Sequence, residues 1–326
     1  MQPQLKLKSR SPVPLSVPRM VDTRGVRRAM FMAIIVCGLG ALCVAQTQSA
    51  PGWASATAHA AKVAPQARIV VLDIATGRLL ASSHLADAAR TLAAPGSTLK
   101  PLALYGLIAA GRCDPSRRIA CDRRLRIAGR SLACSHPAMD PMNAREALTW
   151  SCNTYFAAVG AALGPGDLRR LLAPTGLLGQ TGLASDEAVA EFREPRTRDE
   201  ESLAMLGVDG IRVTPLELAV AYRWLAIQIQ ARPDSAASRV AGAGLKDSAS
   251  FGIAASASLG SVAVAGKTGT ANFGAGTPSH GWFAGLVPAD KPTAVVAVYL
   301  PAGHGANAAQ VAADLLAHSP LRQTQP

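Results

Sequence analysis

Residues 262–272 read Val-Ala-Val-Ala-Gly-Lys-Thr-Gly-Thr-Ala-Asn and decide between two folds. Gly266-Lys267-Thr268 matches the end of a nucleotide-binding P-loop, which requires another glycine five residues before the second one. That position is Ser261. A P-loop also opens into a helix, whereas the glycine-containing segment after Lys267 is typical of a strand that runs to a turn. The P-loop interpretation therefore fails.

Two upstream motifs favour a serine acyl-transfer site instead. Ser97-Thr98-Leu99-Lys100 is Ser-x-x-Lys, Ser151-Cys152-Asn153 is Ser-x-Asn, and Lys267-Thr268-Gly269 completes the set in the required order. Each motif alone is a weak signal in a serine-rich chain. Lysine, however, is scarce after residue 61, where the chain holds Lys62, Lys100, Lys246, Lys267 and Lys291. Two of these stand where a lysine is needed, and an arginine at position 100 could not lose its proton to act as a base.

The three motifs and their surroundings resemble the transpeptidase domain of penicillin-binding proteins. The segments that look like that family are PGSTLKP (95–101), SCNTYF (151–156), VTPLELAVAYRWLA (213–226), AGKTGTA (265–271) and HGWFAGLVPA (280–289). The resemblance covers roughly residues 66–318. It implies a sheet packed between helices, an all-helical subdomain inserted between the first and third motifs, and an active site in the cleft between them.

The resemblance also implies a role for each motif residue. Ser97 is the expected nucleophile at the N-terminus of a helix, and Lys100, one turn later on the same face, is the base that takes its proton. Ser151 relays a proton to the leaving amine, and Asn153 holds Lys100 and the substrate amide. Lys100 must be neutral to take the Ser97 proton, which requires that burial or a neighbouring cation lowers its pKa, and Lys267 is the candidate cation.

Substrate binding is expected along the third motif. By resemblance, Thr268, Gly269 and Thr270 pair with an extended substrate, and the two threonine hydroxyls and Lys267 hold the carboxylate of a terminal D-alanine or of a β-lactam. The backbone amides of Ser97 and Thr270 are the expected oxyanion hole. No metal and no organic cofactor is implied.

The order of secondary structure predicts an α+β fold. A hairpin begins near residue 68, helices follow from about Ser97 to residue 229, and three strands cover 261–270, 280–288 and 293–300 before a closing helix at 306–319. This order predicts an antiparallel sheet flanked by helices, in which the first hairpin returns to pair with the late strands. Thr214, Pro215 and Glu217 predict the start of one of the helices.

The N-terminus predicts export. The net charge is +12, and about half of that excess lies in residues 1–28; residues 29–45 then carry no charge. This segment is at the short end for crossing a bilayer, and the basic flank places the following body outside the cytoplasm. A cleaved signal peptide is the alternative, because small residues suited to cleavage occur at Val44-Ala45 and Ala58-His59-Ala60.

The expected organisation follows from these segments. It is a basic cytoplasmic tail (1–28), a transmembrane signal anchor (29–45), a linker (46–65), a penicillin-binding transpeptidase domain (66–319) and a short tail (320–326). The expected location is the inner membrane, crossed once, with the catalytic domain on the periplasmic side.

Four cysteines lie in the exported body, at positions 113, 121, 134 and 152. An oxidising compartment favours disulfides, and the absence of CxxC spacing and of paired histidines argues against a zinc site. We favour a Cys121–Cys134 disulfide as a hypothesis, because a short polar stretch between the two residues is typical of a hairpin or loop.

The expected activity is D,D-transpeptidation of D-Ala-D-Ala stem peptides in peptidoglycan cross-linking. D,D-carboxypeptidation stays open, as does a non-catalytic β-lactam sensor or scaffold. A class D β-lactamase would carry Ser-x-Val where this chain has Asn153. A class A enzyme needs a deacylating glutamate, and Glu187, Glu191 and Glu194 lie in a suitable interval but outside any recognisable form of that loop.

The expected partners are stem peptides, β-lactams and the membrane. A glycosyltransferase or another cell-wall protein is a further candidate, with the arginine-rich segment 112–130 as its docking surface. Nucleic acid is not expected, because aromatic residues make up only 4% of the chain and much of the positive charge lies in the N-terminal tail.

Overall fold

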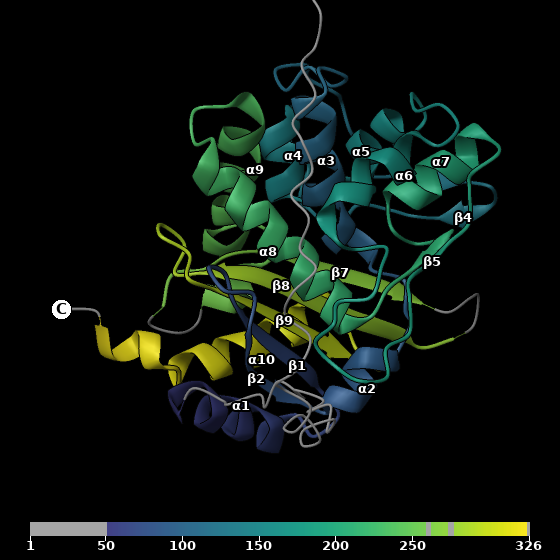
Figure 1. The fold of residues 1–326 in the computed structure, drawn as a ribbon. Coiled ribbons are helices and arrows are strands. Elements are labelled where there is room, and N and C mark those ends of the chain that lie inside the picture. Colours follow the sequence, from purple (N-terminus) through teal and green to yellow (C-terminus); the bar gives the residue numbers. More distant parts are fainter. Residues whose placement is uncertain (1–50, 259–261, 273–276, 325–326) are drawn as a thin grey trace, which may run out of the picture. The chain divides into compact units, whose positions relative to one another are not determined.

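We describe the fold from a computed structural model, which describes residues 51–258, 262–272 and 277–324. Its centre is an antiparallel five-stranded sheet with strand order β2-β1-β9-β8-β7 (Figure 1). The strands are β1 (Arg68–Asp73), β2 (Leu79–Ser83), β7 (Ala265–Asn272), β8 (Ser279–Val287) and β9 (Ala294–Leu300). Arg68 pairs with Tyr299, so the first hairpin does return to the late strands. The predicted α+β fold is confirmed.

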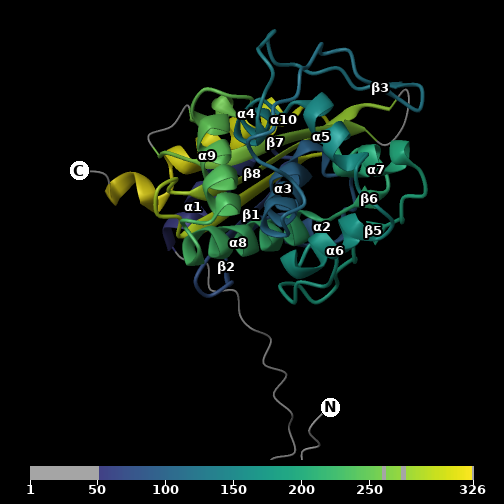
Figure 2. The same ribbon diagram turned by 90° about the horizontal axis from the view of Figure 1, so that it is seen from above.

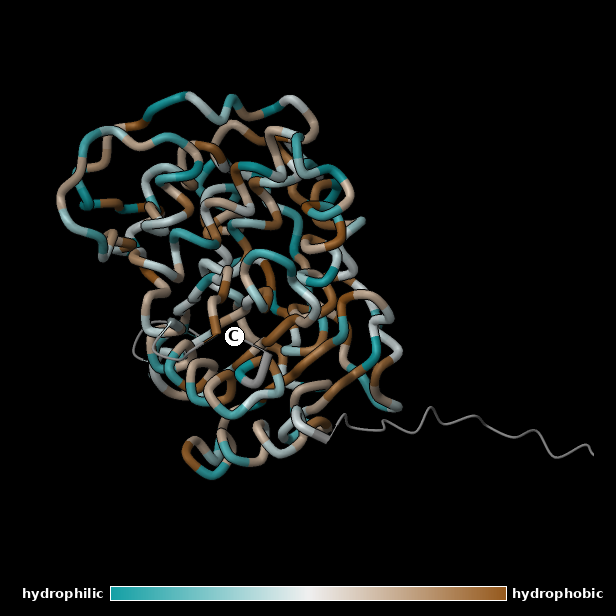
Figure 3. The backbone as a smooth tube through the Cα atoms, turned by 90° about the vertical axis from the view of Figure 1, so that its left-hand side faces the viewer, coloured by the Kyte–Doolittle hydropathy of each residue, from teal (hydrophilic) through white to brown (hydrophobic). Residues whose placement is uncertain are grey.

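Both faces of the sheet are apolar and covered by helices. Ile69 and Val71 belong to one hydrophobic cluster, and Val70 and Leu72 belong to the other, because successive side chains point to opposite faces. Helices α1 (Pro51–Val63) and α10 (Gly305–Ala317) cover one face, and α8 (Pro215–Ala231) and α9 (Ala236–Ser250) cover the other (Figure 1). Figure 3 shows the hydrophobic stretches gathered inside and the hydrophilic ones in the outer loops.

Between the first and third motifs the chain forms a second, mainly helical layer (Figure 2). Its helices are α3 (Lys100–Ala109), α4 (Ala144–Thr149), α5 (Asn153–Gly160), α6 (Asp167–Leu172) and α7 (Arg198–Met205). The prediction that this insert is all-helical is wrong. It also holds two short ribbons, β3 (Arg126–Ile127) with β4 (Arg130–Ser131), and β5 (Glu191–Phe192) with β6 (Ile211–Arg212).

The β3–β4 ribbon has a local cause in the sequence. Ile127 pairs with Arg130, so Ala128 and Gly129 form a two-residue turn, and their φ angles are 46° and 77°. Positive φ at both central residues is the geometry of a type I′ hairpin turn, whose twist matches that of the two strands. This ribbon matters for function, because the chain that leaves it forms one wall of the candidate site.

Helix α8 begins as predicted. Thr214 precedes Pro215, and its hydroxyl accepts a hydrogen bond from the Glu217 amide at 3.1 Å, while the Glu217 carboxylate accepts one from the Thr214 amide at 2.7 Å. This capping box satisfies two donors at the helix end. It anchors the helix that spans β1, β9 and β8 on the site's side of the sheet.

The predicted linker over 46–65 is wrong for residues Pro51–Val63, which form helix α1. Trp53, Ala56 and Ala60 are buried there, because their spacing places them on one apolar face against the sheet and α10. Within the described residues, no helix combines the length and apolar character needed to cross a bilayer. The predicted tail (1–28) and anchor (29–45) lie outside the described residues.

Candidate active site

The three motifs meet around one cavity of about 680 Å³. Ser97 lies in the short 3₁₀ helix η1 (Gly96–Leu99) that precedes α3, Ser151 and Asn153 lie at the start of α5, and the third motif lies on β7. The motif residues on the cavity wall are Ser97, Ser151, Asn153, Thr268, Gly269 and Thr270. Lys100 and Lys267 are fully buried behind this wall. The structure therefore brings the predicted catalytic and substrate-binding residues of the three motifs together at one place.

Ser97 sits where the first motif touches β7. Gly96 has φ +55°, and a Cβ on it would lie 2.8 Å from the carbonyl oxygen and 3.0 Å from the amide nitrogen of Thr270. Only glycine combines this left-handed backbone with so close an approach. The Gly96 amide also donates to the Gly207 carbonyl at 2.8 Å. The amides of residues 97 and 270 are thus brought to the same side of the cavity by backbone contact.

Buried hydrogen bonds fix the turn on both sides of Ser97. The Ala94 carbonyl accepts from the Trp282 indole and from the His280 ring, each at 2.9 Å. The Tyr222 hydroxyl donates to the Thr98 carbonyl at 2.9 Å. Trp282 is fully buried, as its interpretation as core or cleft wall requires. Strand β8 and helix α8 therefore hold the backbone on both sides of Ser97 in place.

Lys100 is hydrogen-bonded to the second motif. Its Nζ lies 2.7 Å from Asn153 Oδ1, 3.0 Å from the Ser151 carbonyl and 3.3 Å from Ser151 Oγ. It also lies 5.0 Å from the centre of the Phe156 ring. Burial lowers the Lys100 pKa to about 7, because removal from water disfavours the ammonium form, while negative charge on two nearby cysteines opposes that shift. A neutral amine is therefore accessible near neutral pH.

The side chain of Lys267, on β7, is buried in the interior near Lys100. Its Nζ donates to the Thr268 carbonyl at 3.0 Å. Burial, and then the charge of Lys100, hold the Lys267 pKa well below its usual value. Of the two expected causes of a low Lys100 pKa, burial and a neighbouring cation, burial is the main one.

The Asn153 side chain is oriented by the loop after β4, which lines the cavity at residues 132 and 133. Its amide nitrogen donates to the Leu132 carbonyl at 3.0 Å, which turns Oδ1 toward Lys100. Ser151 precedes it with φ +57°, a conformation that is uncommon for a residue with a Cβ. The loop after β4 thus sets the geometry of the second motif, and nothing in the sequence indicates this contact.

Strand β7 is an edge of the sheet and borders the cavity. Thr270 is exposed, and its Oγ1 accepts a hydrogen bond from the Gly305 amide at 2.9 Å. A Cβ on Gly269 would lie 2.5 Å from the Pro95 carbonyl oxygen. An edge strand can pair with an extended peptide, and this one carries hydroxyls that can bind an anion. His304, Gly305 and Ala306 complete this end of the wall without any signal in the sequence.

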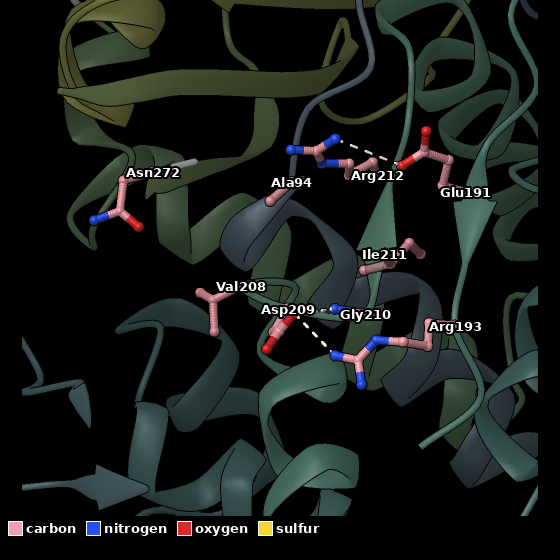
Figure 4. A pocket seen from close by; sticks show the side chains of 9 residues that line it. All are labelled: Ala94, Glu191, Arg193, Val208, Asp209, Gly210, Ile211, Arg212 and Asn272. Atoms are coloured by element: carbon pink, nitrogen blue, oxygen red, sulfur yellow. Dashed lines mark hydrogen bonds and ion pairs between the residues drawn. The ribbon is translucent and has the colours of Figure 1, made fainter. Parts of the chain in front are cut away.

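The glutamates considered for deacylation lie elsewhere. Glu187 accepts hydrogen bonds from the amides of residues 181–184, and Glu194 pairs with Arg169. Glu191 lines a second cavity of about 350 Å³, where it pairs with Arg212 at 3.6 Å (Figure 4). Among the described residues that line the Ser97 cavity, none is a glutamate.

The second cavity adjoins the first, since Val208 lines both. Figure 4 shows Asn272, at the end of β7, facing it from one side. Its other charged pair is Arg193 and Asp209, 3.1 Å apart. Its described lining residues are Ala94, Glu191, Arg193, Val208, Asp209, Gly210, Ile211, Arg212 and Asn272, and none of these is a serine, lysine or histidine.

Comparison with known proteins identifies the arrangement. Residues 67–317 match the family model described as the penicillin binding protein transpeptidase domain. No curated protein matches the chain significantly.

Solved structures share the fold. The apo transpeptidase domain of Burkholderia pseudomallei penicillin-binding protein 3 is 20% identical, with a TM-score of 0.72 over 83% of this chain and 94% of that one. Penicillin-binding protein 2 of Helicobacter pylori, solved in complex with MreC, is 16% identical, with a TM-score of 0.68 over 80% and 61%. Penicillin-binding protein A of M. tuberculosis, solved as a ceftriaxone acyl-enzyme, is 21% identical, with a TM-score of 0.64 over 78% and 74%. At these identities the likeness shows the fold alone.

Proposed function

The chain belongs to the penicillin-binding protein transpeptidase family, and we propose that it is a serine D,D-transpeptidase that cross-links D-Ala-D-Ala stem peptides and binds penicillin. Membership of this family implies serine acyl transfer in cell-wall peptidoglycan cross-linking. The finer proposal rests on Lys100, which is buried, contacts Ser151, Asn153 and the Phe156 ring, and has a pKa of about 7. A lysine in this state can accept the proton of Ser97, which lies three residues earlier in the chain.

Acylation then proceeds in two proton transfers. Ser97 Oγ attacks the carbonyl carbon of the penultimate D-alanine while Lys100 Nζ takes its proton, and the developing oxyanion lies between the amides of residues 97 and 270. When the C–N bond breaks, the proton passes from Lys100 through the Ser151 hydroxyl to the leaving D-alanine amine. An acceptor amine next attacks the ester carbonyl carbon while the neutral Lys100 takes a proton from that amine, and when the bond to Ser97 Oγ breaks, the Ser97 oxygen regains a proton from Lys100.

The substrate carboxylate has a binding site on β7. Because Thr270 Oγ1 already accepts from the Gly305 amide, its hydrogen is directed outward and can be donated to a carboxylate. Thr268 lies two residues earlier, on the same side of the strand. A bound carboxylate also favours the protonated form of the nearby Lys267, because an opposite charge offsets the cost of burying the ammonium group.

The pH dependence of acylation follows from Lys100. Below a pH of about 7 its ammonium form has no lone pair for the serine proton, so the acylation rate should rise with pH through about 7 and then level off. We expect roughly tenfold lower rates about one pH unit below the midpoint. Stopped-flow acylation by a fluorescent penicillin measures the profile. A rate that stays flat through this range would exclude Lys100 as the titrating base.

The alternatives are separated by the fate of the acyl-enzyme. Full-length protein in detergent is incubated with a D-Ala-D-Ala stem pentapeptide, with and without an amine acceptor, and with a β-lactam. Cross-linked product together with D-alanine supports transpeptidation. D-alanine without cross-links indicates a carboxypeptidase, and rapid β-lactam turnover indicates a β-lactamase. A stable β-lactam adduct without any release of D-alanine indicates a sensor or scaffold.

The engagement of Glu187, Glu191 and Glu194 in other contacts speaks against class A deacylation.

We also propose that residues 29–45 anchor the chain in the inner membrane and that a cell-wall partner docks on segment 112–130. Arg117, Arg123 and Arg124 are exposed there, and Arg118 pairs with Glu146 at 3.1 Å. Alanine at all four arginines should remove a partner from complexes purified from membranes, because a charged surface steers and holds docking. Unchanged complexes would end the docking proposal, and recovery of the chain in the soluble fraction would end the anchor proposal.

A further inference from the structure

We propose that the chain binds one zinc ion through Cys121, Cys134, His136 and Cys152, beside the second motif. The four ligand atoms lie within 4.8 Å of one another. The sequence argues against zinc because no CxxC spacing is present, but the ligands come from three separate segments that only the fold brings together. The predicted Cys121–Cys134 disulfide is not formed in the structure, which has all four cysteines of the described body free.

The spacing of the ligand atoms suits a tetrahedral ion. Cys121 Sγ lies 3.6 Å from Cys134 Sγ and 3.6 Å from His136 Nε2. Metal–ligand bonds of about 2.3 Å to sulfur and about 2.0 Å to nitrogen, at tetrahedral angles, place two sulfurs about 3.8 Å apart and a sulfur and a nitrogen about 3.5 Å apart. Thus little movement is needed to close the four ligands around zinc.

The His136 ring already points its Nε2 atom at the cysteine sulfurs, as a zinc ligand must. His136 Nδ1 lies 2.7 Å from the Pro137 carbonyl oxygen, which can only accept, so the proton is on Nδ1 and the Nε2 lone pair faces the cysteines. A backbone carbonyl on the far ring nitrogen is the usual way in which proteins orient a metal-binding histidine. The ring is 1% exposed. Its buried position has no role in the acyl-transfer steps.

The sulfurs are surrounded by donors, as thiolate ligands require. The amides of Asn153, Tyr155 and Arg123 donate to the sulfurs of Cys134 (3.1 Å), Cys152 (3.4 Å) and Cys121 (3.4 Å), respectively. Backbone amides that point at sulfur stabilise negative charge on it, and zinc binds cysteine as the thiolate. Three protein sulfurs and one imidazole fill a four-coordinate site, so the ion would be structural and would have no open position for substrate.

The location gives this ion a positioning role. Cys152 is the middle residue of the Ser-Cys-Asn motif, and Cys134 and His136 belong to the wall segment whose Leu132 carbonyl orients the Asn153 amide. Zinc would therefore tie this wall of the cavity to the start of α5 and fix the residues that hold Lys100. The effect on acylation rests on the proposed function, whereas the metal site itself does not.

Metal content and cobalt spectra of the full-length protein test the site. Protein purified in detergent with reductant should contain about one zinc per chain, and the chelated protein should bind Co²⁺ with the intense visible bands of a tetrahedral thiolate site. Cys134→Ser and His136→Asn should reduce zinc to less than about a tenth per chain. Cys113→Ser is the matched control, because Cys113 lies outside the cluster, and it should keep the metal.

Wild-type protein alone can overturn the proposal, even if the ligand variants fail to fold. Absence of zinc together with absence of a cobalt–thiolate spectrum would refute it, and so would disulfide-bonded cluster cysteines in metal-free protein from the oxidising compartment.

Removal of zinc should also slow penicillin acylation by about 10- to 100-fold, with recovery on adding zinc. If the protein binds zinc but neither the zinc-bound nor the zinc-free protein is acylated, the metal site stands and the proposed function is refuted. If removal of zinc leaves the acylation rate unchanged, the positioning role is refuted.

Discussion

Lys100→Met should lower the rate of penicillin acylation by about a thousandfold, the middle of the range for general-base catalysis. Methionine has a similar length and suits the buried position, but it offers no lone pair of comparable basicity to the Ser97 proton. Lys100→Arg should fail equally, because a guanidinium keeps the charge and does not lose its proton. Rates of adduct formation with a fluorescent penicillin measure both variants.

The matched control is Lys246→Arg. Lys246 forms a surface ion pair with Asp290 at 2.8 Å, and this pair lies far from the motifs in the sequence and outside the cavity wall. Its replacement should leave acylation within about twofold and stability within about 0.5 kcal/mol. Thermal unfolding shows whether Lys100→Met remains folded, since Asn153 loses a buried partner at a cost of about 1–3 kcal/mol. Near-normal acylation by folded Lys100→Met would assign the proton to another group.

Gly96→Ala should lower acylation by about a hundredfold or more through displacement of one oxyanion-hole amide. The added Cβ would lie 2.8 Å from the Thr270 carbonyl oxygen, a distance that real side chains do not tolerate against backbone. Either the turn that carries Ser97 or strand β7 must then move, and the amides of residues 97 and 270 separate. Acylation rates and thermal unfolding are measured on the same preparations.

Gly111→Ala separates this clash from simple backbone strain. Gly111 has φ +67°, close to that of Gly96, but a Cβ there would meet no atom within 4 Å. Both substitutions should cost about 1 kcal/mol or more for the left-handed conformation, and only Gly96→Ala should also lose activity. If both variants acylated at the same rate, the close approach of Gly96 to β7 would have no catalytic role.

The last two strands of the sheet could be predicted closely from the sequence. The predicted interval 293–300 corresponds to β9 (Ala294–Leu300), and 280–288 corresponds to β8 (Ser279–Val287). Short apolar runs bounded by glycine or proline are typical of buried strands. Helix α9 (Ala236–Ser250) is not predicted. The residues that it buries are alanines, serines, one glycine and one leucine, which give a weak apolar signal in the sequence, and packing on β7, α3 and α4 stabilises it.

The identities of the candidate site residues also follow from sequence, since three motifs in order leave little freedom. Their electrostatics do not. The low pKa of Lys100 comes mainly from burial, which depends on helices distant in sequence, and the Leu132 contact that orients Asn153 comes from an arginine-rich loop without a motif. The cysteine cluster is hidden for the same reason. Cys121 and Cys152 are 31 residues apart, and only the β3–β4 ribbon and the start of α5 bring them together.

Mass spectrometry of the protein after exposure to penicillin tests the central claim most directly. Full-length protein is incubated with benzylpenicillin, its intact mass is recorded over hours, and the adduct is located by peptide mapping. We expect a single covalent adduct on Ser97 that persists for many minutes and is absent from Ser97→Ala. An adduct on any other residue, or no adduct on folded protein, would contradict this claim.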